Sequence, residues 1–128
     1  MFKLSNRSAH RMSGIHPLLI SCVTLAMRKY SKIDFGVGEG AIRTKQMQEC
    51  LVADGKSRTM SSKHLPQKDH YSHAVDLYPS GKSNISDAGD HAHIKWAMDM
   101  AAKDLGVELE HGYDWGWDSP HHEIKAIL

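Results

Sequence analysis

The sequence predicts an α+β fold in which helices pack on one face of a small, largely antiparallel sheet. Between residues 87 and 105, apolar side chains recur at the spacing of an amphipathic helix, and Gly106 follows where such a helix would end. Several short segments instead alternate apolar and polar residues, which is typical of strands with one buried face. These helices and strands do not alternate regularly, so the sequence does not favour a parallel βαβ arrangement.

The first half of the chain carries signals for three helices and one strand. Ser5 is placed to cap a short helix that Gly14 ends, and Pro17 stands in the first turn of a second helix. Residues 33–37 alternate in the manner of a short strand, and Thr44 can cap a third helix that stops at Gly55. Two apolar stripes support the second and third helices: Leu19, Cys22, Val23, Ala26, Met27 and Tyr30, and then Met47, Cys50 and Leu51.

The second half begins with a polar, irregular stretch, residues 56–71, which we expect to be a long loop. A strand pattern returns at residues 73–78, another strand begins at Val107, and residues 121–124 can form the last one. His64 is therefore expected in the loop, Asp76 in a strand, and His121 in the final strand.

Length and charge limit the classes of function. A chain of 128 residues fits one domain, here residues 1–128, with a single core. The net charge is +1, with 16 basic and 15 acidic residues, and no basic block points to nucleic acid. The first thirty residues lack the apolar run of a secretory signal, and the longest apolar run, residues 18–20, is far too short to span a membrane. We expect Cys22 and Cys50 to be buried thiols without a disulfide.

Histidine is unusually frequent, with ten in the chain, and two short blocks place histidines near carboxylates. Residues 62–64 and 74–77 form the first block, and residues 118–124 form the second. Two imidazoles and one carboxylate, with a coordination position left open, are typical of a catalytic zinc site, because the open position admits the attacking water. The blocks therefore indicate a zinc-dependent hydrolase, with its cleft on the sheet face opposite the helices.

Strand alternation narrows the choice of ligands. If Val75 and Leu77 face the core, Asp76 faces the other side, and His73 shares the core side and is a poor partner for Asp76. By the same rule His121 and His122 point to opposite faces, so only one of them should reach a metal. The loop supplies the other imidazole, from His64 or His70.

Several other side chains have both a functional and an ordinary interpretation. Asp118 lies in a turn from which it could reach a metal-bound water, or it could simply cap the turn before Pro120. His91 and His93 lie about 200° apart around a helix, so they cannot chelate together and are expected to be exposed. Asp114 and Glu123 could each accept an N–H from a metal-bound histidine.

The sequence resembles the zinc peptidases of bacterial cell-wall metabolism, which include D-alanyl-D-alanine carboxypeptidases and dipeptidases. Within them it resembles the small single-domain phage endolysins that are L-alanyl-D-glutamate peptidases. The resemblance covers nearly the whole chain and is carried by residues 2–5, 14–17, 34–35, 39–40, 42–44, 62–64, 73–77, 105–107, 112–115 and 118–123.

The resemblance implies a role for each matching residue. One Zn²⁺ would be held by His64, Asp76 and His121, with Asp118 as the general base and Arg43 near the substrate and the developing oxyanion. One departure stands out: the family usually places its first histidine seven residues before the aspartate, whereas His64 and Asp76 are twelve apart. Polar residues fill the gap and could bulge outward at little entropic cost, while His70 remains an alternative first ligand.

The resemblance also implies a function. A zinc peptidase of this kind would cut the L-alanyl-D-glutamate bond of the peptidoglycan stem peptide, with Ser62 and Trp115 as substrate contacts. We expect a monomer without stable membrane association, made in the host cytoplasm and reaching peptidoglycan after holin-type release. The alternatives are a D-alanyl-D-alanine carboxypeptidase with the same zinc chemistry and a zinc-binding module without turnover.

Overall fold

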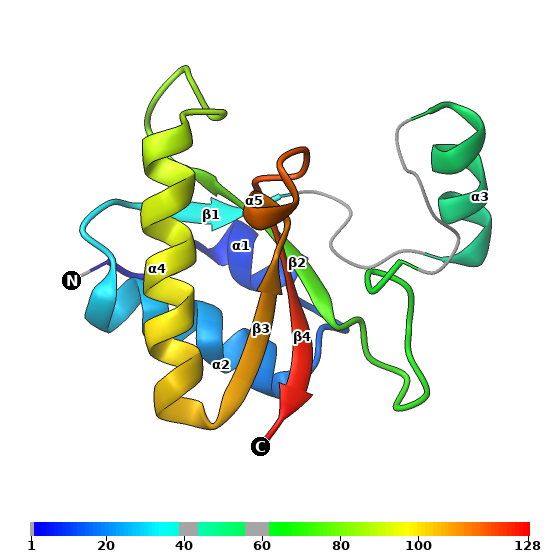
Figure 1. Cartoon of the computed structure of the whole chain (residues 1–128), viewed down its shortest axis with the longest axis horizontal. Helices are drawn as coiled ribbons and strands as arrows, with labels where there is room; N and C mark the ends of the chain where they lie inside the picture. The colour runs from blue at the N-terminus through cyan, green and yellow to red at the C-terminus, as the bar shows by residue number, and fades with distance from the viewer. Residues whose placement is uncertain (1, 39–43, 56–61) are drawn as a thin grey trace.

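A four-stranded antiparallel sheet forms the centre of the computed structural model, which describes residues 2–38, 44–55 and 62–128. The strand order is β1-β2-β4-β3, so β2 and β4 are the central strands (Figure 1). The strands are β1 (Phe35–Val37), β2 (Ala74–Pro79), β3 (Val107–His111) and β4 (His121–Ile127). The predicted α+β fold with an antiparallel sheet is confirmed, and each predicted strand is present.

The N-terminal helices form as their capping residues predict. Ser5 accepts a hydrogen bond from the Ser8 amide at the start of α1 (Asn6–Arg11), and α2 (Pro17–Leu25) has its proline in the first turn. The helix continues into the π-helical turn η1 (Ala26–Tyr30), so the apolar stripe predicted for residues 19–30 spans both segments.

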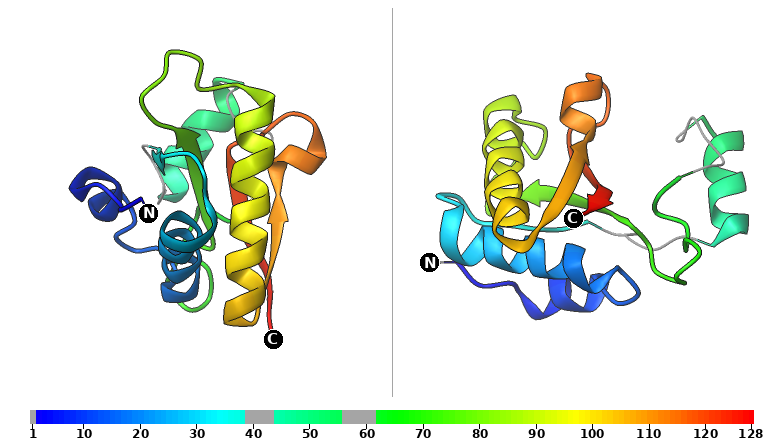
Figure 2. Two further views of the ribbon diagram at one scale, coloured as in Figure 1. Left: turned by 90° about the vertical axis from the view of Figure 1, so that its left-hand side faces the viewer. Right: turned by 60° about the horizontal axis from the view of Figure 1, so that its bottom comes forward.

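The longest helix, α4 (Ala88–Leu105), packs against α2, η1, β3 and β2. Asp87 caps its first turn, and Gly106 ends it with a φ of 72°, a left-handed conformation that glycine adopts without strain. Figure 2 shows α4 running alongside the sheet with α2 below it. The core lies between these elements and includes Leu19, Val23, Met27, Val75, Leu77, Ile94, Met98 and Ile124.

Helix α3 (Lys45–Ala53) forms where predicted, but its apolar side is not buried. Thr44 caps it, yet Met47 is 46% exposed and Cys50 is exposed, so the expectation that both cysteines are buried is wrong for Cys50. Figures 1 and 2 show the reason: α3 lies apart from the sheet and from the other helices. Helical spacing predicts the stripe but not whether another element covers it.

The expectation that His91 and His93 are exposed is also wrong. His91 is only 1% exposed, and its Nε2 lies 2.7 Å from the Ile85 carbonyl oxygen. His93 is partly buried because it stacks on Trp96 and accepts a hydrogen bond from the Lys32 amide. The contacts with Ile85 and Lys32 come from segments outside α4, and helical spacing carries no information about them.

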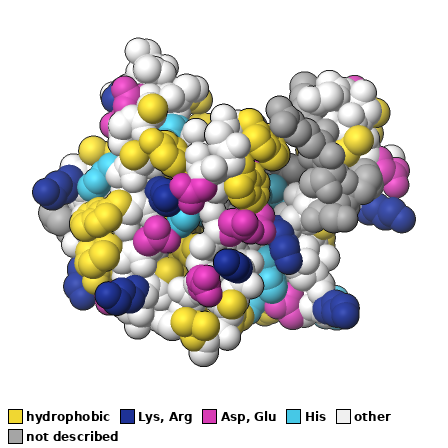
Figure 3. Space-filling model, in the orientation of Figure 1, with side chains coloured by type: hydrophobic (Ala, Val, Ile, Leu, Met, Phe, Trp, Pro, Cys, Tyr) yellow, Lys and Arg dark blue, Asp and Glu magenta, His cyan; other side chains and the backbone are white. Residues whose placement is uncertain are grey.

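The visible surface mixes charges of both signs. Figure 3 shows lysine, arginine, aspartate and glutamate side chains interspersed over the face that it presents. Within the part of the chain that the structure describes, no helix has both the length and the apolar character needed to cross a bilayer.

The different environments of the two cysteines predict different reactivity. Cys22 is fully buried and burial raises the pKa of its thiol to about 11, whereas Cys50 is exposed. Because the thiolate is the nucleophile, we expect iodoacetamide to modify Cys50 in the folded protein and Cys22 at least roughly 100-fold more slowly. Peptide mass spectrometry after timed alkylation measures both rates, and denaturant should equalise them. Equal rates in the folded protein would contradict the burial of Cys22.

Candidate metal centre

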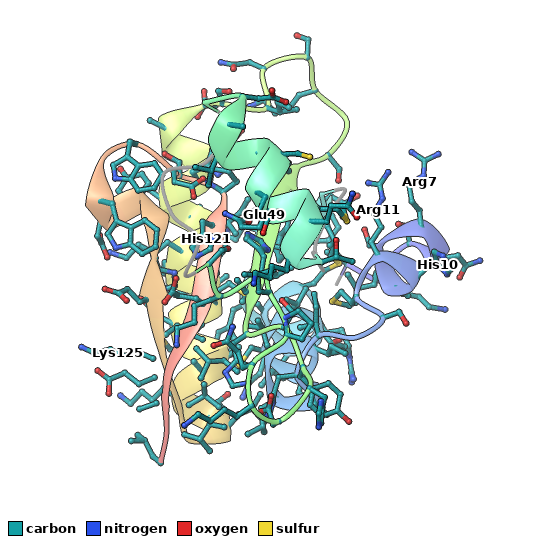
Figure 4. The ribbon with its side chains drawn as sticks, turned by 90° about the vertical axis from the view of Figure 1, so that its right-hand side faces the viewer. Arg7, His10, Arg11, Glu49, His121 and Lys125 are labelled. Atoms are coloured by element: carbon teal, nitrogen blue, oxygen red, sulfur yellow. The ribbon has the colours of Figure 1, made fainter. Side chains whose placement is uncertain are left out.

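The centre of the candidate site is a pair of side chains on neighbouring strands. Asp76 on β2 and His121 on β4 are direct cross-strand partners, so their side chains project from the same face of the sheet. The next pair on this face is Ala74 and Glu123, whereas Val75 and His122 face the opposite side. The prediction that His121 and His122 point to opposite faces is therefore confirmed, and His121 is the one that shares the face of Asp76. Figure 4 shows His121 directed inward, while Lys125 on the same strand points outward.

His64 reaches this pair from the turn that precedes β2. The Ser62 hydroxyl accepts a hydrogen bond from the His64 amide at 3.1 Å, and the His73 amide donates to the Lys63 carbonyl oxygen at 2.9 Å. These bonds hold the turn against the start of β2, and His64 is 2% exposed. The observed contact of Ser62 thus positions His64, and the substrate contact expected of Ser62 stays a prediction.

The three side chains converge with distances that suit one metal ion. His64 Nε2 lies 3.2 Å from His121 Nδ1 and 3.4 Å from Asp76 Oδ1, and His121 Nδ1 lies 3.6 Å from the same oxygen. A tetrahedral zinc ion with bonds of about 2.0–2.1 Å holds its ligand atoms about 3.3 Å apart. In addition, Asp76 Oδ1 is buried and has no hydrogen-bond partner among the residues that the structure describes. A buried carboxylate oxygen without a hydrogen bond is costly unless a cation binds it.

The charges of Asp76 and His121 are mutually stabilised. Burial by itself would raise the pKa of Asp76, but the imidazoles of His121 and His64 outweigh burial and lower it far below the usual value for aspartate. Burial would likewise lower the pKa of His121, but Asp76 and Glu123 outweigh it and raise the pKa to about 9. Asp76 and His121 thus each favour the charged form of the other.

Glu123 fixes the orientation of the His121 ring. Its Oε1 lies 2.8 Å from His121 Nε2, and because an ionised carboxylate can only accept, the ring nitrogen must donate. With its proton on Nε2, a neutral His121 presents an Nδ1 lone pair to Asp76 and His64, as a metal ligand requires. Of the two carboxylates considered for this role, Glu123 makes the contact, whereas Asp114 lies 2.6 Å from Lys95 Nζ.

Asp118 lies beside the group without belonging to it. Its Oδ2 is 3.8 Å from His121 Nδ1, and its side chain is 32% exposed, so the carboxylate borders both the ligand atoms and solvent. Its own carbonyl oxygen accepts a hydrogen bond from the His121 amide at 3.1 Å, which fixes the turn leading into β4. The geometry therefore allows a proton-transferring carboxylate next to the metal ligands.

Comparisons with known proteins identify the family of this chain. The profile of the family described as phage L-alanyl-D-glutamate peptidase matches residues 1–127. The chain belongs to this family. An L-alanyl-D-glutamate peptidase of Escherichia phage T5 is 30% identical to this peptidase over 130 residues, covering 97% of this chain and 90% of that protein. The crystal structure of the L-Ala D-Glu endopeptidase ChiX of Serratia marcescens matches with a TM-score of 0.81 and 31% identity, covering 97% of this chain and 90% of that one.

Three other residues named from the sequence, Trp115, His70 and Arg43, differ in where they lie. Trp115, in α5 (Gly112–Trp115), lies with its ring centroid 5.1 Å from that of His121 and 5.5 Å from that of Trp117, so it borders the site of the peptidase. His70 is exposed and is not part of the group formed by His64, Asp76 and His121. Arg43 lies outside the described residues.

Two histidine clusters were not anticipated. On the other face of the sheet, His122 Nδ1 lies 2.7 Å from His111 Nδ1, and His111 Nε2 lies 2.6 Å from Asp99 Oδ1. The pairing of β3 with β4 aligns His111 with His122, so a correct register would have revealed this contact. The second cluster joins His16 to residues of the loop before β2, and the sequence carries no local signal for it.

Gly112 allows the backbone near Asp118 to approach α5. A Cβ atom at position 112 would lie 1.9 Å from the Asp118 carbonyl oxygen and 2.9 Å from His121 Cβ. We expect Gly112→Ala to destabilise the fold by about 1–3 kcal/mol and to weaken metal binding, because the backbone at Asp118 has to move. Thermal unfolding and zinc titration measure the two effects.

The matched control for this substitution is Gly89→Ala in the first turn of α4. There the nearest contact of a new Cβ is Asp87 Oδ1 at 3.2 Å, the side-chain oxygen that caps the helix, which needs to shift by only a few tenths of an ångström, and alanine favours the helix. Unchanged unfolding temperature and zinc affinity in Gly112→Ala would show that the close approach does not shape the site.

Proposed function

We propose that this peptidase is a zinc-dependent endolysin that cleaves the L-alanyl-D-glutamate bond of the peptidoglycan stem peptide. In this proposal His64, Asp76 and His121 hold one zinc ion, and Asp118 is the general base. The observation that carries it is the convergence of His64 Nε2, Asp76 Oδ1 and His121 Nδ1, which lie 3.2–3.6 Å apart. Among the described residues, the buried Asp76 Oδ1 has no hydrogen-bond partner. The names of the family and of the two relatives support the assignment of the L-alanyl-D-glutamate bond as the bond that is cleaved.

In this proposal zinc, Asp118 and Glu123 have different roles in the reaction. When bound, zinc supplies a Lewis acid that lowers the pKa of water and polarises a carbonyl group. Asp118 takes the proton from the attacking water and returns it to the leaving amine, a role worth about 10²- to 10⁴-fold in rate. Glu123 keeps the His121 proton on Nε2 and so keeps Nδ1 available as a ligand.

The substrate-facing residues are also part of the proposal. Trp115 lies against His121 and forms one wall beside the ligands, where it can contact the stem peptide. Ser62 would contact the same peptide, and Arg43 would stabilise the oxyanion or a substrate carboxylate. We further propose that the enzyme acts as a monomer, is made in the host cytoplasm and meets peptidoglycan after holin-type release.

A digest of purified peptidoglycan tests both the bond and the metal. We expect products with a new N-terminal D-glutamate, detected by mass spectrometry of the muropeptides, and no such products after treatment with a chelator. Activity should return when zinc is added. Loss of a terminal D-alanine instead would assign the enzyme as a D-alanyl-D-alanine carboxypeptidase. Full lysis by metal-free protein would contradict the zinc mechanism, and no digestion even with added zinc would indicate a binding module.

The role of Asp118 can be separated from metal binding. We expect Asp118→Ala to lower kcat by about 10²- to 10⁴-fold while the protein keeps one zinc ion per chain, because the carboxylate transfers protons but is not a ligand. Muropeptide release gives the rate, and metal analysis of the same preparation gives the zinc content. Asp114→Asn is the control, since Asp114 lies in the same part of the chain but pairs with Lys95. Loss of zinc together with activity in Asp118→Ala would show a structural role.

A further inference from the structure

A second group of metal-ligand side chains lies outside the proposed zinc site. It consists of His16, before α2, and Asp69 and His73, in the segment before β2. Asp69 Oδ2 lies 2.7 Å from His73 Nε2 and 3.8 Å from His16 Nε2, and the three ligand atoms lie within 4.8 Å of one another. The side chains of His16 and His73 are 16% and 18% exposed, and that of Asp69 is 40% exposed, so an ion can enter from solvent.

We propose that His16, Asp69 and His73 form a second binding site for a divalent transition-metal ion. Two imidazole nitrogens and one carboxylate oxygen suit Zn²⁺, Ni²⁺ or Cu²⁺ better than Ca²⁺ or Mg²⁺, which prefer oxygen ligands. The separations of 2.7 Å and 3.8 Å lie on either side of the about 3.3 Å spacing of a tetrahedral zinc site, so small side-chain rotations suffice. Water would complete the coordination.

The backbone holds the three side chains together before any ion binds. The His16 amide donates to the Ser72 carbonyl oxygen at 2.9 Å, and the Ser72 amide donates to the Gly14 carbonyl oxygen at 3.0 Å. These bonds fix the segment before β2 against the start of α2. Asp69 Oδ1 accepts a hydrogen bond from the Tyr71 amide at 3.0 Å, which leaves Oδ2 to face the imidazoles. Little ordering is therefore needed when an ion enters.

The second site binds more weakly than the first because His16 already has a structural role. Its Nδ1 accepts a hydrogen bond from the Leu18 amide at 3.1 Å and so caps α2, with the ring proton on Nε2. An ion at Nε2 shifts that proton to Nδ1 and breaks the cap, which reduces the affinity by about fivefold. Greater exposure weakens the site further. We expect a dissociation constant in the micromolar range.

Occupation of the second site would affect the segment that carries the first one. Asp69 and His73 both lie between His64 and Asp76, two of the proposed zinc ligands. An ion shared with His16 would add a further link between this segment and α2, beside the backbone hydrogen bonds that already join them. Binding at the second site therefore stabilises the fold as a whole, by mass action on the folded state.

The test is a calorimetric titration of ZnCl₂ into full-length protein that has been dialysed to constant zinc content. We expect uptake of one further ion per chain with micromolar affinity. Asp69→Asn and His16→Asn should weaken this uptake by roughly tenfold or more, because loss of a direct ligand costs at least as much as loss of an outer hydrogen bond. Zinc retained on dialysis and lytic activity at that zinc content should stay unchanged, which separates this site from the proposed catalytic one.

Each variant is chosen to preserve the local fold. Asparagine at position 69 keeps the acceptor for the Tyr71 amide, and asparagine at position 16 is a good helix cap. The matched control is His70→Asn, which removes an exposed imidazole from the same loop and tolerates its φ of 69°. No second uptake by the parent protein, unchanged uptake in both cluster variants, or equal loss in His70→Asn would overturn the proposal.

Discussion

The pairing of β2 with β4 determines where the ligands of the candidate site can be. Asp76 and His121 are opposite each other in this register, and their side chains leave the sheet on the same face. A shift of one residue on β4 would place His122 instead of His121 opposite Asp76. The His121 imidazole would then point into the core. The apolar face opposes such a shift, because Val75, Leu77 and Ile124 are buried there. The same strand register therefore determines both the packing of the core and the geometry of the ligands.

Further residues refine the arrangement that the pairing of β2 with β4 provides. His64 comes from a turn held by Ser62, and Glu123 sets the proton position of His121 from two residues further along β4. Gly112 lets the turn at Asp118 lie close to α5 and brings that carboxylate near His121. The turn at His64, the carboxylate of Glu123 and the close approach at Gly112 therefore complete a site that Asp76 and His121 begin.

The sequence could predict those features that depend on local period and capping. Alternation along 73–78 and 121–124 selected Asp76 and separated His121 from His122, and Ser5, Pro17, Thr44 and Gly106 marked helix ends that the structure confirms. Alternation left His64 and His70 open, and only the resemblance to a family favoured His64. The buried state of His91, the exposure of Cys50 and the cluster around His16 depend on contacts between distant segments, for which one sequence gives no direct signal.

The order β1-β2-β4-β3 makes β1 and β3 the edge strands of the sheet, and α1 contacts the outer side of β1, where Ser8 Oγ accepts a hydrogen bond from the Val37 amide. Such edges can recruit strands from other molecules and start aggregation. β1 is only three residues long, and the outward positions of β3 carry the exposed Glu108 and Glu110. A short edge on one side and a negatively charged edge on the other disfavour intermolecular strand addition. The strands that carry Asp76 and His121 thus lie in the interior of the sheet, away from both edges.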